Sequence, residues 1–381
     1  MKTLGRYLSR EIWLAVSFVL LALMALFFVL DLMQELQEVG RAQYKLQHAA
    51  LFVALELPAI AYQVMPIAAL IGTIYALAQF AANSEFTIMR ASGMSTWRAS
   101  RTIVRAALLL VAVTFVVGEY VAPPATAYGK KMKLLHLGKA ASAEFRSGFW
   151  VKDVVLDAEG SEVGVRFVNA TEVLPDGTLH GVKLFEFDLQ RRLRSLAQAV
   201  SATYEPGTGW RLSDLTETRF VPAKADRGLF AGQELVYETQ VKHTPSGVWP
   251  ARVDADVFAS VFVDPGDMSV VGLWSYIDHL KTTRQKTIAY EIALWKKVMY
   301  PLAVVFMMLL ALPFAYLHTR SGGVSLKIFA GIMLGIGFYV INELSSHLGA
   351  LRDWPPPLAA LTPSLVALAI ATIWLRWVER H

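Results

Sequence analysis

The sequence contains no cysteine, which excludes disulfide bonds, thiolate metal sites and cysteine nucleophiles. It also lacks three enzyme motifs: the G-x-x-x-x-G-K-[ST] loop that binds nucleotides, the H-E-x-x-H zinc motif and the G-x-S-x-G nucleophile motif. The eight histidines are scattered, and none pairs with another at metal-ligand spacing. We therefore expect a protein that is not an enzyme and that holds no metal and no cofactor.

Long apolar runs are what the sequence has instead. Hydrophobic residues make up 55% of the 381 residues. They gather into six runs, and the length of each is close to that of a membrane-spanning helix, which requires about 20 residues. The runs cover residues 11–33, 56–81, 102–124, 297–318, 326–345 and 357–377. This pattern predicts an α-helical integral membrane protein with six transmembrane helices, and no cleavable signal peptide is expected because no small-residue cleavage site follows the first run.

The basic residues orient the predicted spans. Lys and Arg gather at the N-terminus, between the second and third runs, and after the last run, at Lys2, Arg6, Arg10, Arg90, Arg98, Arg101, Arg105, Arg376 and Arg380. Cytoplasmic loops of membrane proteins carry such an excess, so we expect both termini to lie in the cytoplasm. The net charge of +5 fits this bias and does not call for nucleic acid as a partner. Lys296 and Lys297 run against the bias, since they fall at the outer end of the fourth run.

Residues 137–265 have a different pattern. Runs such as FWVKDVVL and GVKLFEFDL alternate apolar and polar residues, and the turn signals PDGT and EPGTG separate such runs. The pattern predicts an inserted all-β domain, a sandwich or a roll, and its place after three spans puts it outside the cytoplasm. The stretch DMSVVGLWSYIDHLK follows, and its apolar residues recur at helical spacing. We expect it to form an amphipathic helix at the outer membrane interface.

These patterns divide the chain into three parts. Residues 1–125 hold the first three spans, with a short cytoplasmic helix over 83–93. Residues 126–284 hold the periplasmic β domain and its flanking amphipathic helix. Residues 285–381 hold the last three spans. In the fifth span, Gly331, Gly335 and Gly337 are suited to close helix packing.

The short helix over 83–93, in the stretch NSEFTIMRASGMS, has signals at both ends. Asn83 or Ser84 can cap its start, and Glu85 then lies in the first turn, where the helix dipole favours a carboxylate. Gly93 is placed to end it. Phe86, Ile88 and Met89 give it an apolar side. Two interpretations remain open: a turn that rests on the membrane, or a coupling helix that docks into a partner, with Glu85 facing a basic group there.

A second candidate site is the cluster GKKMKLLHLGK, directly after the third run. Lys130, Lys131, Lys133 and Lys139 lie on the outer side, where topology does not require positive charge, and Lys130 and Lys133 share a helical face. The cluster is either a solvated run that meets ordinary lipid headgroups or a binding site for a phosphate-bearing substrate of the outer leaflet. Lysine binds phosphate as a point charge.

Three spans, a periplasmic β domain and three further spans, with SEFTIMRASG between the second and third spans, resemble the lipopolysaccharide export permeases of the LptF/LptG family. The resemblance covers essentially the whole chain. The stretches GEYVAP, GFWVKD and LWKKVMYPL are more similar to the LptG branch than to the LptF branch.

The resemblance implies a transmembrane subunit of an ABC exporter. In this family LptF and LptG pair, two copies of the ATPase LptB bind below, LptC joins from the periplasm, and lipopolysaccharide leaves the inner membrane through periplasmic β-jellyroll domains towards LptA and the outer membrane. It implies that the residues facing the ATPase are Ser84, Glu85, Phe86, Met89, Arg90 and Gly93. It also implies that Lys130, Lys133 and Lys297 face the lipid A phosphates.

One stretch departs from the family. Members often carry lysines at the outer end of the first span, whereas QELQEVGRAQ has Gln37 and Glu38 there, and Arg41 is the nearest cation. Either the substrate is charged differently or Arg41 supplies the contact. The alternatives to an LptG-like permease are an LptF-like subunit of the same complex, a non-transporting membrane scaffold, or an intramembrane enzyme. An enzyme would need convergent His, Asp or Glu residues at one membrane face, which the sequence does not show.

Overall fold

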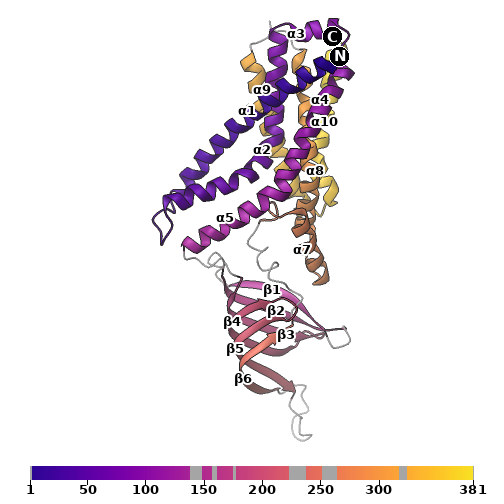
Figure 1. The fold of residues 1–381 in the computed structure, drawn as a ribbon. Coiled ribbons are helices and arrows are strands. Elements are labelled where there is room, and N and C mark those ends of the chain that lie inside the picture. Colours follow the sequence, from indigo (N-terminus) through magenta and orange to yellow (C-terminus); the bar gives the residue numbers. More distant parts are fainter. Residues whose placement is uncertain are drawn as a thin grey trace.

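The computed structural model describes residues 2–137, 148–156, 161–174, 177–222, 237–250, 264–316 and 324–380. A bundle of long helices forms one end of the molecule, and a β-sheet forms the other (Figure 1). The helices α5 and α7 lie at the end of the bundle that faces the sheet (Figure 1).

The described residues contain six helices that are long and apolar enough to cross a membrane, which confirms the expected six spans. Their elements are α1 (Lys2–Glu35), α2 (Leu46–Ala82), α4 (Thr96–Val116) continued by the π-helix η1 (Val117–Val121) and α5 (Ala122–Leu137), α8 (Ile288–Ala311) with the short η3 (Leu312–Ala315), α9 (Val324–Leu351) and α10 (Pro356–Arg380). The third helix therefore continues past residue 124, where its apolar run ends.

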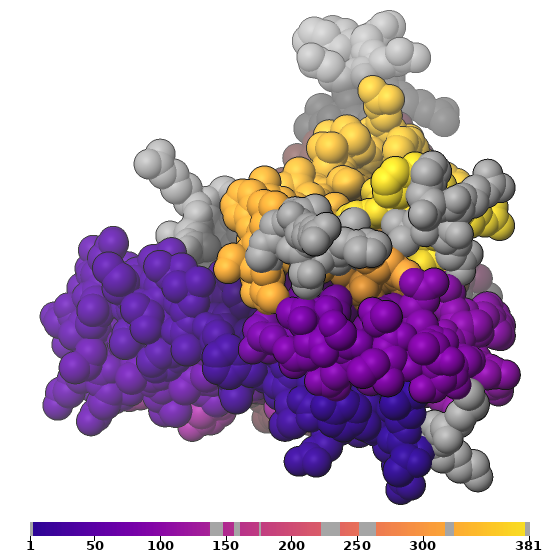
Figure 2. Space-filling view, turned by 90° about the horizontal axis from the view of Figure 1, so that it is seen from above, coloured from indigo at the N-terminus to yellow at the C-terminus, as the bar shows by residue number. Residues whose placement is uncertain are grey.

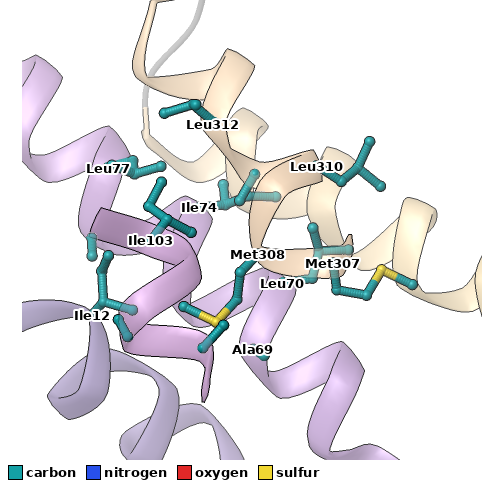
Figure 3. Close-up of a cluster of buried hydrophobic side chains, with 14 of the residues drawn as sticks. Ile12, Ala69, Leu70, Ile74, Leu77, Ile103, Met307, Met308, Leu310 and Leu312 are labelled. Carbon is teal, nitrogen blue, oxygen red and sulfur yellow. The ribbon is translucent and has the colours of Figure 1, made fainter. Parts of the chain in front are cut away.

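Helix α2 forms the centre of the bundle. Its buried side chains Leu70, Ile74 and Leu77 belong to one apolar cluster with residues of α1, α4 and α8 (Figure 3). Because the lipid offers no hydrophobic driving force between helices, close packing of this kind holds the bundle together. Two prolines, Pro58 and Pro66, lie inside α2 without ending it.

Glycines allow the helices to approach α2 closely. A Cβ atom on Gly331 or Gly335 of α9 would lie 2.6 Å from Ile74 or 2.9 Å from Ile67, whereas Gly337 faces no atom of the chain within 4 Å. The packing expected for the first two glycines is therefore confirmed, and the third takes no part in it.

The β domain is one antiparallel sheet in the described residues. Its strands are β1 (Phe149–Leu156), β2 (Glu162–Val173), β3 (Leu179–Asp188), β4 (Leu193–Glu205), β5 (Gly209–Pro222) and β6 (Tyr237–Trp249), and they pair in sequence order. Val151 pairs with Val168, and Val168 with Leu184, so one face carries a row of buried apolar residues. The expected all-β fold is confirmed, although the described strands form a single sheet rather than two.

The expected amphipathic helix is α7 (Val270–Thr282). Leu273, Ile277 and Leu280 are buried, whereas Val271 and Trp274 are exposed. The helix packs on α8 and points from the bundle towards the sheet (Figure 1).

Both ends of the chain lie at the end of the bundle that is remote from the sheet, next to the short helix α3 (Glu85–Ala91) (Figure 1). Seen from that end, α3 and its neighbours lie beside the N-terminal part of α1 (Figure 2). The two ends of the molecule thus carry the two groups of residues that the sequence singles out.

We predict that Gly72→Ala lowers the stability of the bundle by about 1–3 kcal/mol, because overpacking forces backbones apart. A Cβ atom there would lie 2.6 Å from the Cα atom of Val16 in α1. Thermal unfolding of the detergent-solubilised chain measures the effect. Gly337→Ala is the matched control and should leave the midpoint unchanged; equal midpoints for both variants would contradict the close approach of α1 and α2.

Candidate functional site

Helix α3 ends as the sequence predicts but begins differently. Gly93 has a φ of 88°, its N–H donates to the Arg90 carbonyl at 2.9 Å, and the Met94 N–H donates to the Met89 carbonyl at 3.1 Å. This is the Schellman arrangement that glycine permits. Ser84 precedes the helix with a φ of 60°, in the left-handed region, and its side chain makes no capping hydrogen bond. The expected cap is therefore absent, because a capping residue needs an extended backbone.

The apolar side of α3 faces its own chain. Phe86 and Met89 are buried, and the Phe86 ring meets the Tyr316 ring edge-on at 5.1 Å. The Arg90 guanidinium lies over the same Tyr316 ring, also at 5.1 Å. Phe86 and Met89 therefore fix α3 on the bundle instead of offering an apolar side to a partner, which corrects the expectation from the sequence.

The exposed apolar residues at this end are different ones. Ile88 of α3 is 63% exposed, and Trp97 at the start of α4 is 77% exposed. The sequence analysis did not single out Trp97. The available signal was a large aromatic residue in a polar, basic connection between two spans. The sequence does not show whether such a side chain is buried or exposed.

Glu85 has a part-exposed carboxylate beside neutral donors. The Tyr7 hydroxyl of α1 donates to Oε2 at 3.3 Å, and the Asn83 amide donates to Oε1 at 3.5 Å. Within the described residues Glu85 forms no ion pair. Its charge is therefore available to a basic group outside the chain.

A cavity of about 520 Å³ lies at the opposite end of the bundle, near the sheet. Side chains from α2, η1, α5, α8 and α9 and the segment 264–267 line it. Its polar lining includes Tyr62, Asp267, Lys296, Lys297, Asn342 and Glu343. Charged side chains of α8 and α9 meet there with those of Asp264 and Asp267.

Of the four predicted cations, Lys297 lines this cavity and Lys130 pairs with Asp267 on its wall. Lys130 of α5 forms an ion pair with Asp267 at 2.8 Å, and Lys297 donates to the carbonyl of the next residue, Met268. Lys297 is only 7% exposed. Both lysines thus hold the segment that leads into α7 and lines the cavity.

The other two predicted cations lie elsewhere. Lys133 forms an ion pair with Glu35 at the end of α1, at 2.8 Å, and its ammonium lies over the Phe52 ring. The Tyr44 hydroxyl donates to the same carboxylate, and burial together with this bond raises the pKa of Tyr44 above its ordinary value. Arg41 is exposed and pairs with Glu38 at 2.7 Å. Lys139 lies outside the described residues.

The structure adds two residues that the sequence analysis did not assign to a site. Lys296 forms an ion pair with Glu343 of α9 at 2.7 Å at the cavity. Asn342 is 5% exposed and lines the cavity. The available signal for this site in the sequence was the adjacent pair Lys296 and Lys297, because both charges run against the positive-inside bias.

The ion pairs at this end are partly exposed. Lys130 and Asp267 have side-chain exposures of 30% and 21%, and such pairs stabilise a fold by about 0–1 kcal/mol. The Lys130 ammonium can therefore exchange the Asp267 carboxylate for another acceptor without a large loss of stability.

Comparison with known proteins identifies relatives over nearly the whole chain. The model of the family "Lipopolysaccharide export system permease LptF/LptG" matches residues 6–377. The chain is 28% identical over 373 residues to "Lipopolysaccharide export system permease protein LptG" of Escherichia coli (strain K12), covering 98% of this chain and 97% of that protein. It is 29% identical, with the same coverage, to the protein of that name from Haemophilus influenzae.

We predict stability effects of very different size for two residues of α3, one buried and one exposed. Phe86→Ala should lower the free energy of unfolding by about 3–5 kcal/mol, because it leaves a cavity beside Tyr316. Ile88→Ala should change it by less than about 0.5 kcal/mol, because the side chain is exposed. Denaturant unfolding of the isolated chain in detergent distinguishes the two, and a larger loss for Ile88→Ala would show that α3 is rotated.

Proposed function

This chain belongs to the LptF/LptG family of lipopolysaccharide export system permeases, and on that premise we propose how its two ends serve export. It is a membrane-spanning permease subunit for lipopolysaccharide export and not itself the enzyme. We propose that it takes the LptG position in a heterodimer with LptF. The relatives named LptG, which cover 98% of the chain, and the stretch GEYVAP support this choice.

The work of export comes from a partner. Drawing a lipid out of a bilayer costs about 0.8 kcal/mol for each CH₂ group exposed. A lipid with several acyl chains therefore requires a cycle driven by ATP, and this sequence has no nucleotide-binding loop. We assign hydrolysis to a dimer of LptB that docks at α3, with LptC and LptA receiving the lipid. A non-transporting scaffold would require neither an exposed carboxylate at α3 nor lysines at the outer end.

The basic residues orient the subunit in the inner membrane. Arg98, Arg101 and Arg105 lie at the α3 end of α4, and both termini lie at the same end (Figure 1). This end is therefore assigned to the cytoplasm, and the sheet and the cavity to the periplasmic side.

The cavity is the proposed site for the phosphates of lipopolysaccharide. The observation that carries this assignment is that Lys296 and Lys297 line the cavity together with the buried Asn342, at the ends of the spans where topology does not require positive charge. Lys130 and Lys296 reach the cavity through ion pairs that a phosphate can replace, and Lys297 adds its charge from the wall. Lys133, and Arg41 beyond it, extend the positive charge towards α1.

The acyl chains then lie against exposed apolar faces of the bundle. On α1 these faces include Phe18 and Leu21, and on α9 they include Phe329 and Met333. Apolar side chains exposed on a membrane helix meet acyl chains in any case, so the charges at the outer end supply the selectivity.

We predict that Glu85→Ala weakens assembly with the ATPase or uncouples hydrolysis from export, with a loss of about tenfold, equivalent to roughly 1.4 kcal/mol. Glu85→Lys should be worse, because it brings like charges together at a buried contact. Co-purification and lipid transfer in proteoliposomes measure both effects. Tyr7→Phe is the control, since it removes only the hydroxyl that donates to Glu85. Unchanged assembly and export in Glu85→Lys would exclude the coupling role.

We also predict that replacing both Lys130 and Lys133 with Glu lowers crosslinking to lipopolysaccharide by about tenfold or more, roughly 1.4 kcal/mol, while assembly with the ATPase persists. Arginine at both positions should largely preserve function, because a point charge is what the site requires.

Two variants control for this double substitution. Lys131→Glu places the same charge on an exposed position of the same helix and should crosslink normally. Asp267→Asn removes the partner of Lys130 without changing the lysine. If Asp267→Asn reproduces the loss, or if the double variant crosslinks normally, the lysines do not bind the phosphates.

A further inference from the structure

The start of α7 is held by two side chains from different spans. Both carboxylate oxygens of Glu119, in η1 of the third span, accept from the backbone N–H of Val270, at 2.9 and 3.1 Å. Lys297 of α8 donates to the carbonyl of Met268, two residues earlier. At the start of α7, the backbone therefore donates one hydrogen bond to the Glu119 carboxylate and accepts one from the Lys297 ammonium.

Each side chain suits the group that it holds. The first N–H groups of a helix have no partner inside the helix, and the helix dipole makes this end positive, so a carboxylate stabilises it. Glu119 supplies that carboxylate from 151 residues away in sequence. Lys297 is nearly fully buried, and a buried ammonium is retained only where it has a partner such as this carbonyl.

The π-helical turn places Glu119. The residues of η1 are wound more widely than an α-helix, and single π-turns of this kind occur often at functional positions. Next to Glu119, Gly118 packs directly on the Tyr62 ring of α2, and a Cβ atom there would overlap the ring. The π-helical turn therefore packs on α2 at the centre of the bundle, while the Glu119 carboxylate faces α7.

The other end of α7 contacts the sheet. Lys152 of β1 donates to the Thr283 carbonyl at 2.7 Å, directly after the helix. Arg284 forms an ion pair with Glu162 of β2 at 3.4 Å. Helix α7 therefore has one end held by side chains of the third and fourth spans. Its other end contacts the first two strands, through the part-buried Lys152 hydrogen bond and the exposed Arg284–Glu162 pair.

We infer that Glu119 and Lys297 are positioning residues that clamp α7 to the spans, and that α7 in turn holds the β domain in a fixed position over the cavity. Lys297 then acts on the wall of the cavity and does not itself need to touch a ligand. The inference is independent of what the cavity binds, because it concerns the position of the sheet in the empty subunit.

The experiment measures the distance between the sheet and the bundle. Because the chain has no cysteine, two introduced cysteines carry spin labels at chosen positions only. Leu351→Cys, at the outer end of α9, and Val241→Cys, on β6, replace exposed residues. Pulsed electron paramagnetic resonance on the full chain in lipid nanodiscs then gives the distribution of label-to-label distances, without any substrate.

We expect a narrow distribution in the parent and loss of the narrow peak in Glu119→Ala and in Lys297→Met. The width of the distribution in Glu119→Gln should lie between those of the parent and of Glu119→Ala, because the glutamine amide oxygen can still accept a hydrogen bond. Ser269→Ala is the matched control: it removes the side-chain cap of the same helix end, whose Oγ accepts from the Gly272 N–H, and leaves both clamping residues in place.

Two results would overturn the inference. One is a parent-like distribution in Glu119→Ala; the other is an equal broadening in Ser269→Ala, which would show that only the stability of the helix end matters. A second label pair, Ile88→Cys with Leu351→Cys, reports on the bundle itself. If Glu119→Ala also broadens the distances within the bundle, the milder variant Glu119→Gln is used for the test. A parent-like distribution of sheet-to-bundle distances in Glu119→Gln would then contradict the clamp.

Discussion

The hydrocarbon core of a membrane contains no water, so each backbone polar group there needs a partner inside the protein. Six long helices satisfy this constraint, and the rest of the architecture depends on it. The polar side chains of the two candidate sites lie at the two ends of the bundle. At one end they surround α3, and at the other they line a cavity next to the sheet.

The two ends solve different mechanical problems. At the α3 end, Phe86 and Met89 pack a short helix against the bundle, and Gly93 ends it sharply, so that α3 is firmly attached to the spans. At the outer end, ion pairs such as that of Lys130 with Asp267 are partly exposed and exchangeable. Under the proposed function, the rigid contact would transmit work from the ATPase and the exchangeable contacts would let the lipid enter and leave.

Neutralisation within the chain explains how so many charges lie close to the membrane. Lys130, Lys133 and Lys296 each have an acidic partner on another element. Lys297 has a carbonyl, which suits a more deeply buried ammonium. Each of these cations is thereby paired or hydrogen-bonded within the chain.

The sequence by itself determined the features that are encoded locally. Apolar run length set the six spans, alternation set the strands, and Gly93 set the end of α3, because each depends on neighbouring residues alone. Only the tertiary structure decided which side of α3 is buried, since Phe86 meets Tyr316 across 230 residues of sequence, and which group Lys297 holds, since Met268 arrives from another element. Charge and hydropathy show that a side chain needs a partner, but the identity of that partner depends on how distant helices pack.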